Sequence, residues 1–203
     1  MISLTYCNSN KLSGPLPVQI LSLQKLYSLS LNSNNFTGHI PKEYGSFPQL
    51  QFLYLSFNLL SGHIPYELGN LSKLLVLSLC ANQLTGVIPL SISNLTQLGD
   101  LNFNSNKLHG QIPPELGRIK SMTLLDLGHN HLTGQIPSEL FANAQLSTLI
   151  LGYNYFTGTF SKMATFCNFL INRIIHLGSI PPDIIKLNKS LTILSATNNL
   201  LSG

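Results

Sequence analysis

The stretch that decides the fold is LQKLYSLSLNSNNFTGHIP, residues Leu23 to Pro41. Twenty-four residues later the chain reads FPQLQFLYLSFNLLSGHIP, and three further copies follow in the same register. One asparagine marks each unit at intervals of 24, namely Asn10, Asn34, Asn58, Asn82, Asn106, Asn130 and Asn154. The shared pattern is LxxLxxLxLxxNxLxGxIP. A register held over this length is typical of a protein built from stacked repeats.

Each position of the unit predicts a structural feature. Leucines at alternate positions, such as Leu29 and Leu31, indicate a short strand whose leucines point inward. One unit cannot bury its apolar face alone, so neighbouring units must stack and pair their strands in one parallel sheet. The asparagine amide can satisfy backbone groups where the chain turns after each strand, and stacked asparagines would form a ladder. We expect strands at about 27–31, 52–55, 76–79, 100–103, 124–127 and 148–151, and buried side chains at Leu53, Leu79, Leu101, Leu127 and Leu151.

The sequence resembles the leucine-rich repeat family. Its LxGxIP half is similar to the plant-specific extracellular subclass, which includes the MIK-type receptor-like kinases. The resemblance implies an α/β solenoid, a right-handed curved array with a parallel β-sheet on the concave face and loops and short 3-10 turns on the convex face. It also implies a second short strand on one flank. We expect a single array over residues 1–203, with about 8–9 repeats and both terminal caps missing, as in a fragment of a longer protein.

The register breaks after Gly158. Gly178 follows after only 20 residues, and Ile174 stands where the ladder asparagine is expected. We interpret residues 159–177 as an irregular repeat, either a small ligand-binding insertion or a degenerate repeat. The short interval favours the degenerate repeat, because an inserted ligand element lengthens a chain. The last unit aligns best with Asn199 as its ladder residue.

Composition and motifs argue against several functions. Charged residues make up 9% of the 203 residues, against about 25% in typical domains, and the net charge of +4 includes no basic run that would suit nucleic acid. No run of 18 apolar residues is present, and Cys7, Cys80 and Cys167 cannot form a complete disulfide framework. The sequence has no phosphate-binding loop and no kinase, hydrolase or zinc-protease motif, so we expect no catalytic residue, metal or cofactor. His39 and His63, one repeat apart, are interpreted as a surface pair on the flank.

The carboxylates fall into two groups. One group follows the repeat proline by two residues, which predicts the convex or flanking side, and comprises Glu43, Glu67, Glu115, Glu139 and Asp183. Asp100 and Asp126 instead fall on outward strand positions of adjacent repeats, so we expect them on the concave face within about 10 Å of each other. Two alternatives stay open, a binding spot for a basic ligand group and plain solvated strand residues. Acid/base catalysis is disfavoured, because an open face provides no burial that would raise a pKa.

Phe52 and Tyr54 also occupy outward positions, where aromatic rings do not contribute to the core and are plausible binding anchors. Phe57 and Tyr153, just before ladder asparagines, flank the same surface. We expect substitution of Tyr54 or Asp126 to leave the fold unchanged, because both side chains point away from the core. The predicted ligand-binding face comprises Ser28, Ser30, Asn32, Phe52, Tyr54, Ser56, Val76, Ser78, Asp100, Asn102, Asn104, Leu124, Asp126 and Thr148.

The resemblance implies an extracellular recognition module, part of the ectodomain of a plant receptor-like serine/threonine kinase or receptor-like protein at the outer face of the plasma membrane. Its implied partners are a peptide or protein ligand and the leucine-rich repeat ectodomain of a co-receptor. The alternative is a secreted protein similar to the polygalacturonase-inhibiting proteins, which bind a cell-wall hydrolase. Predicted N-glycosylation sites are Asn35, Asn70, Asn94 and Asn188.

Overall fold

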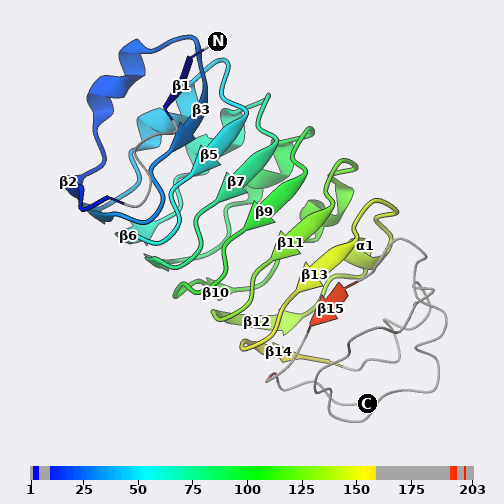
Figure 1. Ribbon diagram of the computed structural model, residues 1–203. Coiled ribbons are helices and arrows are strands. Elements are labelled where there is room, and N and C mark those ends of the chain that lie inside the picture. The colour runs from blue at the N-terminus through cyan, green and yellow to red at the C-terminus, as the bar shows by residue number, and fades with distance from the viewer. Residues whose placement is uncertain (1, 5–9, 159–192, 196–198, 200–203) are drawn as a thin grey trace.

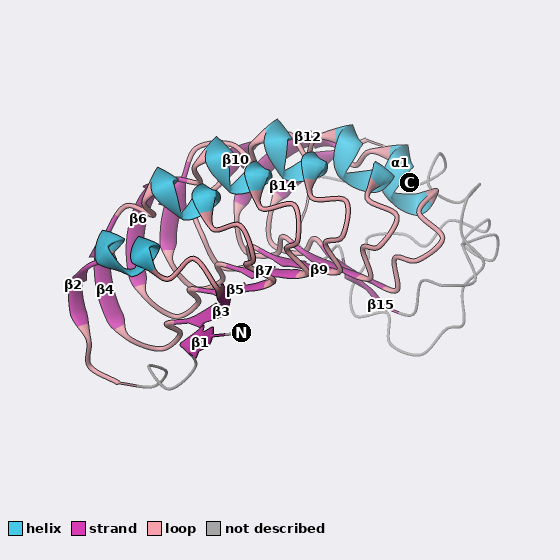
Figure 2. Cartoon of the chain, turned by 90° about the horizontal axis from the view of Figure 1, so that it is seen from above, coloured by secondary structure: helices cyan, strands magenta, loops and turns pink. Residues whose placement is uncertain are grey.

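The computed structural model describes residues 2–4, 10–158, 193–195 and 199. Within these ranges the chain winds through successive coils that stack side by side (Figure 1). Seen from above, the stack is curved, with the long sheet on its inner side and the helices on its outer side (Figure 2). The curved solenoid expected from the resemblance is therefore confirmed.

The inner side is an eight-stranded parallel sheet to which each coil contributes one strand. Its order is β1 (Ile2–Leu4), β3 (Leu26–Ser30), β5 (Phe52–Tyr54), β7 (Val76–Ser78), β9 (Asp100–Asn102), β11 (Leu124–Asp126), β13 (Thr148–Ile150) and β15 (Ile193–Ser195). Equivalent leucines pair across it, as Leu53 does with Leu77. The six strands expected from the LxL pattern are confirmed to within one residue at each end.

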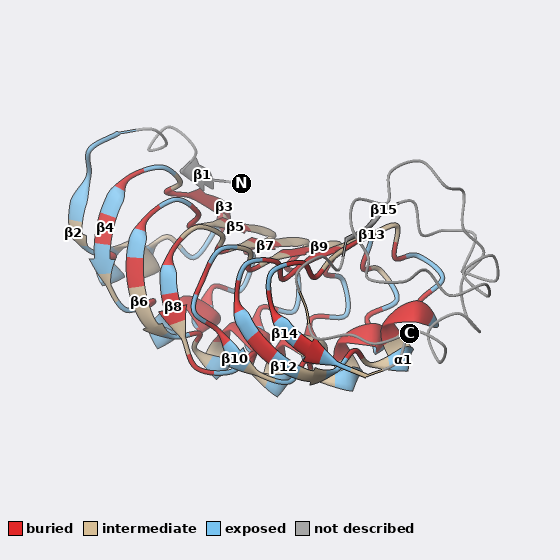
Figure 3. Cartoon of the chain, turned by 90° about the horizontal axis from the view of Figure 1, so that it is seen from below, coloured by how far each residue is buried: buried red, intermediate tan, exposed pale blue. Residues whose placement is uncertain are grey.

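The LxGxIP half of the unit forms short strands on one flank, also parallel. One flanking sheet comprises β2 (Ser13–Pro15), β4 (Asn35–Gly38), β6 (Leu59–His63) and β8 (Gln83–Thr85), and the other comprises β10 (His109–Gly110), β12 (His131–Gln135) and β14 (Tyr155–Thr157). Hydrogen bonds of 2.8 Å from Lys107 N to Leu84 O and from His109 N to Gly86 O connect the two groups. Buried and exposed residues alternate along these strands (Figure 3), so the second strand implied by the resemblance is confirmed.

Short helices cover the convex side, and each begins directly after a repeat proline, whose fixed φ suits the entry to a helical turn. They are the 3-10 helices η1 (Val18–Ser22), η2 (Lys42–Ser46), η3 (Tyr66–Asn70), η4 (Leu90–Asn94) and η5 (Pro114–Arg118), followed by α1 (Ser138–Phe141). Four of the acidic residues predicted on the convex or flanking side lie in the first turns of η2, η3, η5 and α1, where a negative charge interacts favourably with the helix dipole. They are Glu43, Glu67, Glu115 and Glu139. Asp183 lies outside the described residues.

The core fills the space between the sheet and the helices. All five leucines expected to be buried, Leu53, Leu79, Leu101, Leu127 and Leu151, have no exposed surface. Tyr44 from η2 is equally buried, and its hydroxyl donates a 3.2 Å hydrogen bond to the Pro17 carbonyl oxygen.

The asparagine ladder is present and connects each coil to the one before it. Asn58 shows the pattern, since its Nδ2 donates to Leu31 O at 3.0 Å and Leu55 O at 3.2 Å while its Oδ1 accepts from Phe36 N at 3.0 Å. The residue before six of the ladder asparagines has a left-handed backbone with φ between 53° and 59°, at Ser33, Phe57, Ala81, Ser105, His129 and Tyr153. This conformation costs an L-residue energy, and we attribute its repetition to the ladder bonds that it permits.

The far end of the array joins two coils that are distant in the sequence. β15 pairs directly with β13, and Asn199 accepts from Phe156 N at 3.0 Å and donates to Leu151 O at 3.2 Å. Asn199 is therefore the ladder residue of the coil next to Asn154, as the alignment predicted. These neighbours are 45 residues apart, 21 more than the 24 of a regular coil (199 − 154 = 45, 45 − 24 = 21). The predicted irregular repeat at 159–177 lies outside the described residues.

Candidate functional site

The concave face is formed by the outward residues of the main sheet, in two rows fixed by the strand register. One row passes through Ser28, Phe52, Val76, Asp100, Leu124 and Thr148. The other passes through Ser30, Tyr54, Ser78, Asn102, Asp126 and Ile150. The predicted face thus follows the inner curve in two rows, and its role in binding stays a prediction.

Several polar members of this face bond to one another across neighbouring strands. Asn32 Oδ1 accepts from Ser56 N at 2.7 Å, the hydroxyls of Ser56 and Ser78 lie 2.7 Å apart, and Ser56 Oγ accepts from Cys80 N at 3.1 Å. Ser56 is 2% exposed, and Ser28 and Ser30 are also buried. These side chains stabilise the ends of the strands, and little of their surface remains for a ligand.

Asp126 differs from its sequence-based description as an open concave carboxylate. It is 9% exposed, and its Oδ1 accepts from Asn104 Nδ2 at 2.9 Å and from Gly128 N at 3.1 Å. The carboxylate therefore joins two coils and fixes the turn that leads to the ladder. Removing it would leave the buried Gly128 N–H without this acceptor, so we now expect replacement of Asp126 to destabilise the chain, contrary to the expectation from sequence.

The aromatic residues of the face form a cluster that we call the aromatic patch: Tyr27, Phe52 and Tyr54. Phe52 and Tyr54 are parallel, with ring centroids 6.4 Å apart and an interplanar angle of 7°. Tyr27 meets Phe52 edge to face, also at 6.4 Å, with an angle of 79°. All three rings are partly exposed, so they offer apolar surface that the core does not use.

A small cleft of about 210 Å³ lies beside the aromatic patch and is lined by Lys25, Tyr27, Gln49 and Gln51. Sequence reasoning missed Tyr27, because it shares the alternation of the inward residues Leu29 and Leu31. Leu26, one residue earlier, takes the core position at the start of β3 and leaves Tyr27 partly exposed. The LxxL spacing of the unit was the signal that could have identified it.

The surroundings of Tyr54 raise the pKa of its side chain. Burial raises the pKa of its hydroxyl, and the negative charge of Asp100 raises that pKa further. Asp100 itself accepts a 3.0 Å hydrogen bond from Thr123 Oγ1. The Tyr54 hydroxyl is therefore a neutral hydrogen-bond donor at physiological pH, next to a carboxylate on the concave face.

The flank and the loops hold the other predicted residues. His39 and His63 lie on the flank, where each ring occupies the space above a glycine of the next coil, Gly62 and Gly86 respectively. Asn35, Asn70 and Asn94 are exposed, as glycosylation requires, whereas Asn188 lies outside the described residues. The described part of the chain brings together no group of three or more His, Cys, Asp or Glu side chains that would suit a metal ion. None of its helices is long and apolar enough to cross a membrane.

Comparison with known families agrees with this geometry. The sequence profile described as Leucine Rich Repeat matches residues 25–47, 49–71, 73–95 and 121–143, each of which contains one strand of the main sheet. The chain belongs to the leucine-rich repeat family. A comparison of this leucine-rich repeat protein with curated proteins gives no match.

Three solved structures similar to this leucine-rich repeat array come from plants. The peptide hormone receptor RGFR1, in complex with RGF2, is 35% identical with a TM-score of 0.82, and the match covers 97% of this chain and 32% of that one. The Arabidopsis receptor kinase HAESA, in complex with the peptide hormone IDA and the co-receptor SERK1, is 32% identical with a TM-score of 0.80. The match covers 100% of this chain and 34% of that one. A plant ice-binding protein is 30% identical with a TM-score of 0.81, covering 99% and 58%. The chain thus spans about a third to three fifths of the length of these relatives, whose functions differ.

Proposed function

We propose that this chain is an extracellular recognition module that binds a peptide or protein on its concave face. The observation that carries the proposal is the aromatic patch, where three partly exposed rings lie together on a face that the scaffold leaves open. Aromatic side chains are enriched among the residues that dominate binding energy, because they bury a large area with few rotatable bonds.

The proposed ligand places an apolar or aromatic side chain on the patch. The neighbouring cleft, with Lys25, Gln49 and Gln51, supplies hydrogen bonds to a peptide backbone, while Asp100 suits a basic group. RGFR1 and HAESA each have a peptide hormone bound, which supports a peptide as the class of ligand. We further propose that a longer parent protein of the receptor-like kinase or receptor-like protein type presents this array outside the cell, with a co-receptor ectodomain as a second partner.

The test uses peptides selected from a random library on the full chain, with binding measured by titration. Tyr54→Ala should weaken binding by about 30-fold, as expected for loss of about 2 kcal/mol from a binding anchor. Tyr66 provides the matched control, because it is 69% exposed but lies in η3 on the convex side. Tyr66→Ala should change the affinity less than twofold. Equal affinities for Tyr54→Ala and the wild-type chain would rule out the aromatic patch as the binding site.

Substitutions of Asp100 and Asp126 provide a second test, because one should affect binding and the other stability. Asp100→Asn should weaken the binding of a basic peptide by a factor that declines as salt is added, because an exposed charge pair is screened. Asp126→Ala should instead lower the stability of the chain, because it removes the oxygen that accepts hydrogen bonds from Asn104 Nδ2 and from the buried Gly128 N–H. A thermal melt of each variant, run beside the binding titration, separates these two effects.

A further inference from the structure

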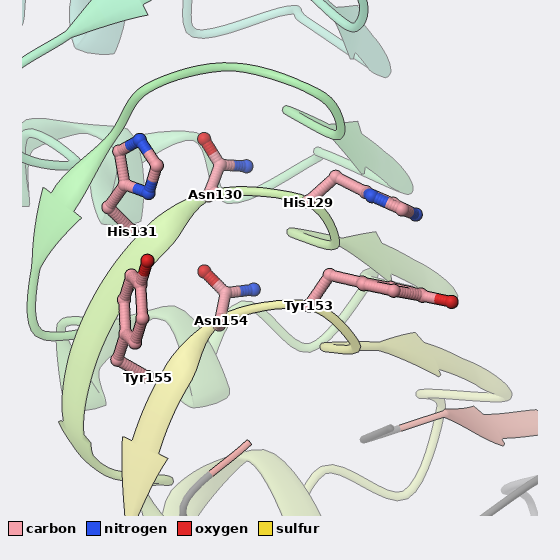
Figure 4. A pocket seen from close by; sticks show the side chains of 6 residues that line it. All are labelled: His129, Asn130, His131, Tyr153, Asn154 and Tyr155. Atoms are coloured by element: carbon pink, nitrogen blue, oxygen red, sulfur yellow. The ribbon is translucent and has the colours of Figure 1, made fainter. Parts of the chain in front are cut away.

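A second surface, distinct from the aromatic patch, lies along the asparagine ladder near the end of the regular array. It is a pocket of about 370 Å³ lined by His129, Asn130, His131, Tyr153, Asn154 and Tyr155 (Figure 4). The six residues occupy equivalent positions in two consecutive coils. We call it the ladder-edge pocket.

Two pairs of rings border the pocket, one on each side of the ladder. His129 and Tyr153 stack with centroids 4.1 Å apart and an interplanar angle of 13°. His131 and Tyr155 lie 5.9 Å apart at 29°. Figure 4 shows Asn130 and Asn154 between these pairs, so the asparagines form the floor and the rings form the walls.

The rings are not needed by the scaffold. Ser33, Ala81 and Ser105 hold the same position as His129 in other coils, with the same left-handed backbone and the same following ladder asparagine. Tyr153 and Tyr155 are each 50% exposed. Small residues adopt the same turn in other coils, and Asn35, Gln83 and Lys107 stand at the position of His131, so the repeat itself does not require rings at these four positions.

The two asparagine side chains of the floor are polar, but they already make hydrogen bonds to the backbone. Asn130 Nδ2 donates to Phe103 O, Leu127 O and Gly128 O at 3.0–3.2 Å, and its Oδ1 accepts from Leu108 N at 3.0 Å. Asn154 makes the equivalent bonds one coil later. New hydrogen bonds to a ligand must therefore come mainly from the ring nitrogens of the histidines and the tyrosine hydroxyls.

The lining contains no Asp, Glu, Lys or Arg side chain. A permanently charged ligand would find no countercharge there, whereas a neutral ring with an apolar face and hydroxyl groups around its edge matches both the walls and the rim. We propose that the ladder-edge pocket binds a pyranose ring of a neutral oligosaccharide, held between the two ring pairs and hydrogen-bonded at its edge. The site is separate from the proposed peptide-binding patch.

The experiment titrates the full chain with cellotetraose and with chitotetraose, followed by saturation-transfer NMR and calorimetry at neutral pH. At least one sugar should bind saturably, and both Tyr153→Ala and Tyr155→Ala should weaken that binding at least tenfold. Tyr155→Phe, which keeps the ring and removes the hydroxyl, should weaken it less than Tyr155→Ala. All three variants should melt within a few degrees of the wild-type chain, because the substituted side chains are half-exposed.

Phe57→Ala is the matched control. Phe57 holds the position of Tyr153 in an earlier coil, is 60% exposed, and lies outside the pocket, so its removal should leave sugar binding unchanged. Tyr54→Ala should also leave it unchanged, which separates this proposal from the peptide-binding proposal. Absence of saturable sugar binding would overturn the inference, as would equal losses in Phe57→Ala. Binding there of a tryptophan-containing peptide but of neither sugar would likewise overturn it and assign the pocket to a protein partner.

Discussion

Replacing Asn82 by alanine tests the energetic role of the ladder. Asn82 Oδ1 accepts from Leu60 N at 3.1 Å, and Nδ2 donates to three carbonyl oxygens at 3.0–3.3 Å. Each carbonyl keeps another donor when the amide is removed: Leu55 O keeps Asn58 Nδ2, Leu79 O keeps Asn106 Nδ2, and Cys80 O keeps Phe57 N. Only the buried Leu60 N–H loses its acceptor. One buried unsatisfied group costs about 1–3 kcal/mol, so we expect that loss of unfolding free energy, not the roughly 4–12 kcal/mol of four such groups.

The assay combines urea unfolding, followed by circular dichroism, with amide hydrogen exchange. Gln83→Ala is the control, because Gln83 is the exposed neighbour of Asn82 and should cost less than about 0.5 kcal/mol. In Asn82→Ala the Leu60 amide should exchange faster than the equivalent Leu84 amide, which keeps its 3.0 Å bond to Asn106 Oδ1. Equal stability of the two variants, together with continued protection of Leu60, would refute the stabilising role of the ladder.

Three further predictions concern the scaffold. Leu101→Ala should lower the unfolding free energy by about 2–5 kcal/mol in urea titrations, because Leu101 is fully buried. Burial raises the pKa of Tyr44 above its usual value of 10, so the contribution of this residue to stability is complete below pH 10 and declines as the pH rises beyond it. The difference in melting temperature between the wild-type chain and Tyr44→Phe should therefore be smaller at pH 11 than at pH 8. Gly62→Ala should lower the melting temperature more than Gly38→Ala, although both glycines have φ of +77°, because only the new Cβ at position 62 overlaps the His39 ring. Adding His39→Ala to both variants should remove this difference.

The repeat determined what could be predicted. The strands of the main sheet, the buried leucines and the ladder, including Asn199, follow from a pattern in which each position has one steric or hydrogen-bonding task. The flanking strands were implied only by the resemblance to the plant subclass. Asp126 was misjudged because alternation tells which face a side chain is on but not which neighbours it meets. Its burial depends on Asn104 in the preceding coil and on Gly128, whose missing side chain leaves room for that amide.

The ladder-edge pocket shows a different limit. His129 and Tyr153 are 24 residues apart, as are His131 and Tyr155, so the register already placed each pair on adjacent coils. Of these four residues, the sequence singled out only Tyr153, as a residue flanking the concave face. Stacking angles and the intervening volume depend on side-chain conformation, which the repeat period does not specify.

The pairing of β13 with β15 has a consequence for chain entropy. In regular coils the hydrogen bonds from a backbone N–H to the next ladder asparagine span 22 residues, whereas the bond from Phe156 N to Asn199 spans 43. Loop-closure entropy grows only with the logarithm of loop length, so this near-doubling costs about 0.6 kcal/mol. That is less than the loss expected from one ladder asparagine. A solenoid coil of this type can therefore gain a segment of roughly twenty residues with little thermodynamic penalty, which makes the junction between two coils a natural place for such an array to acquire new sequence.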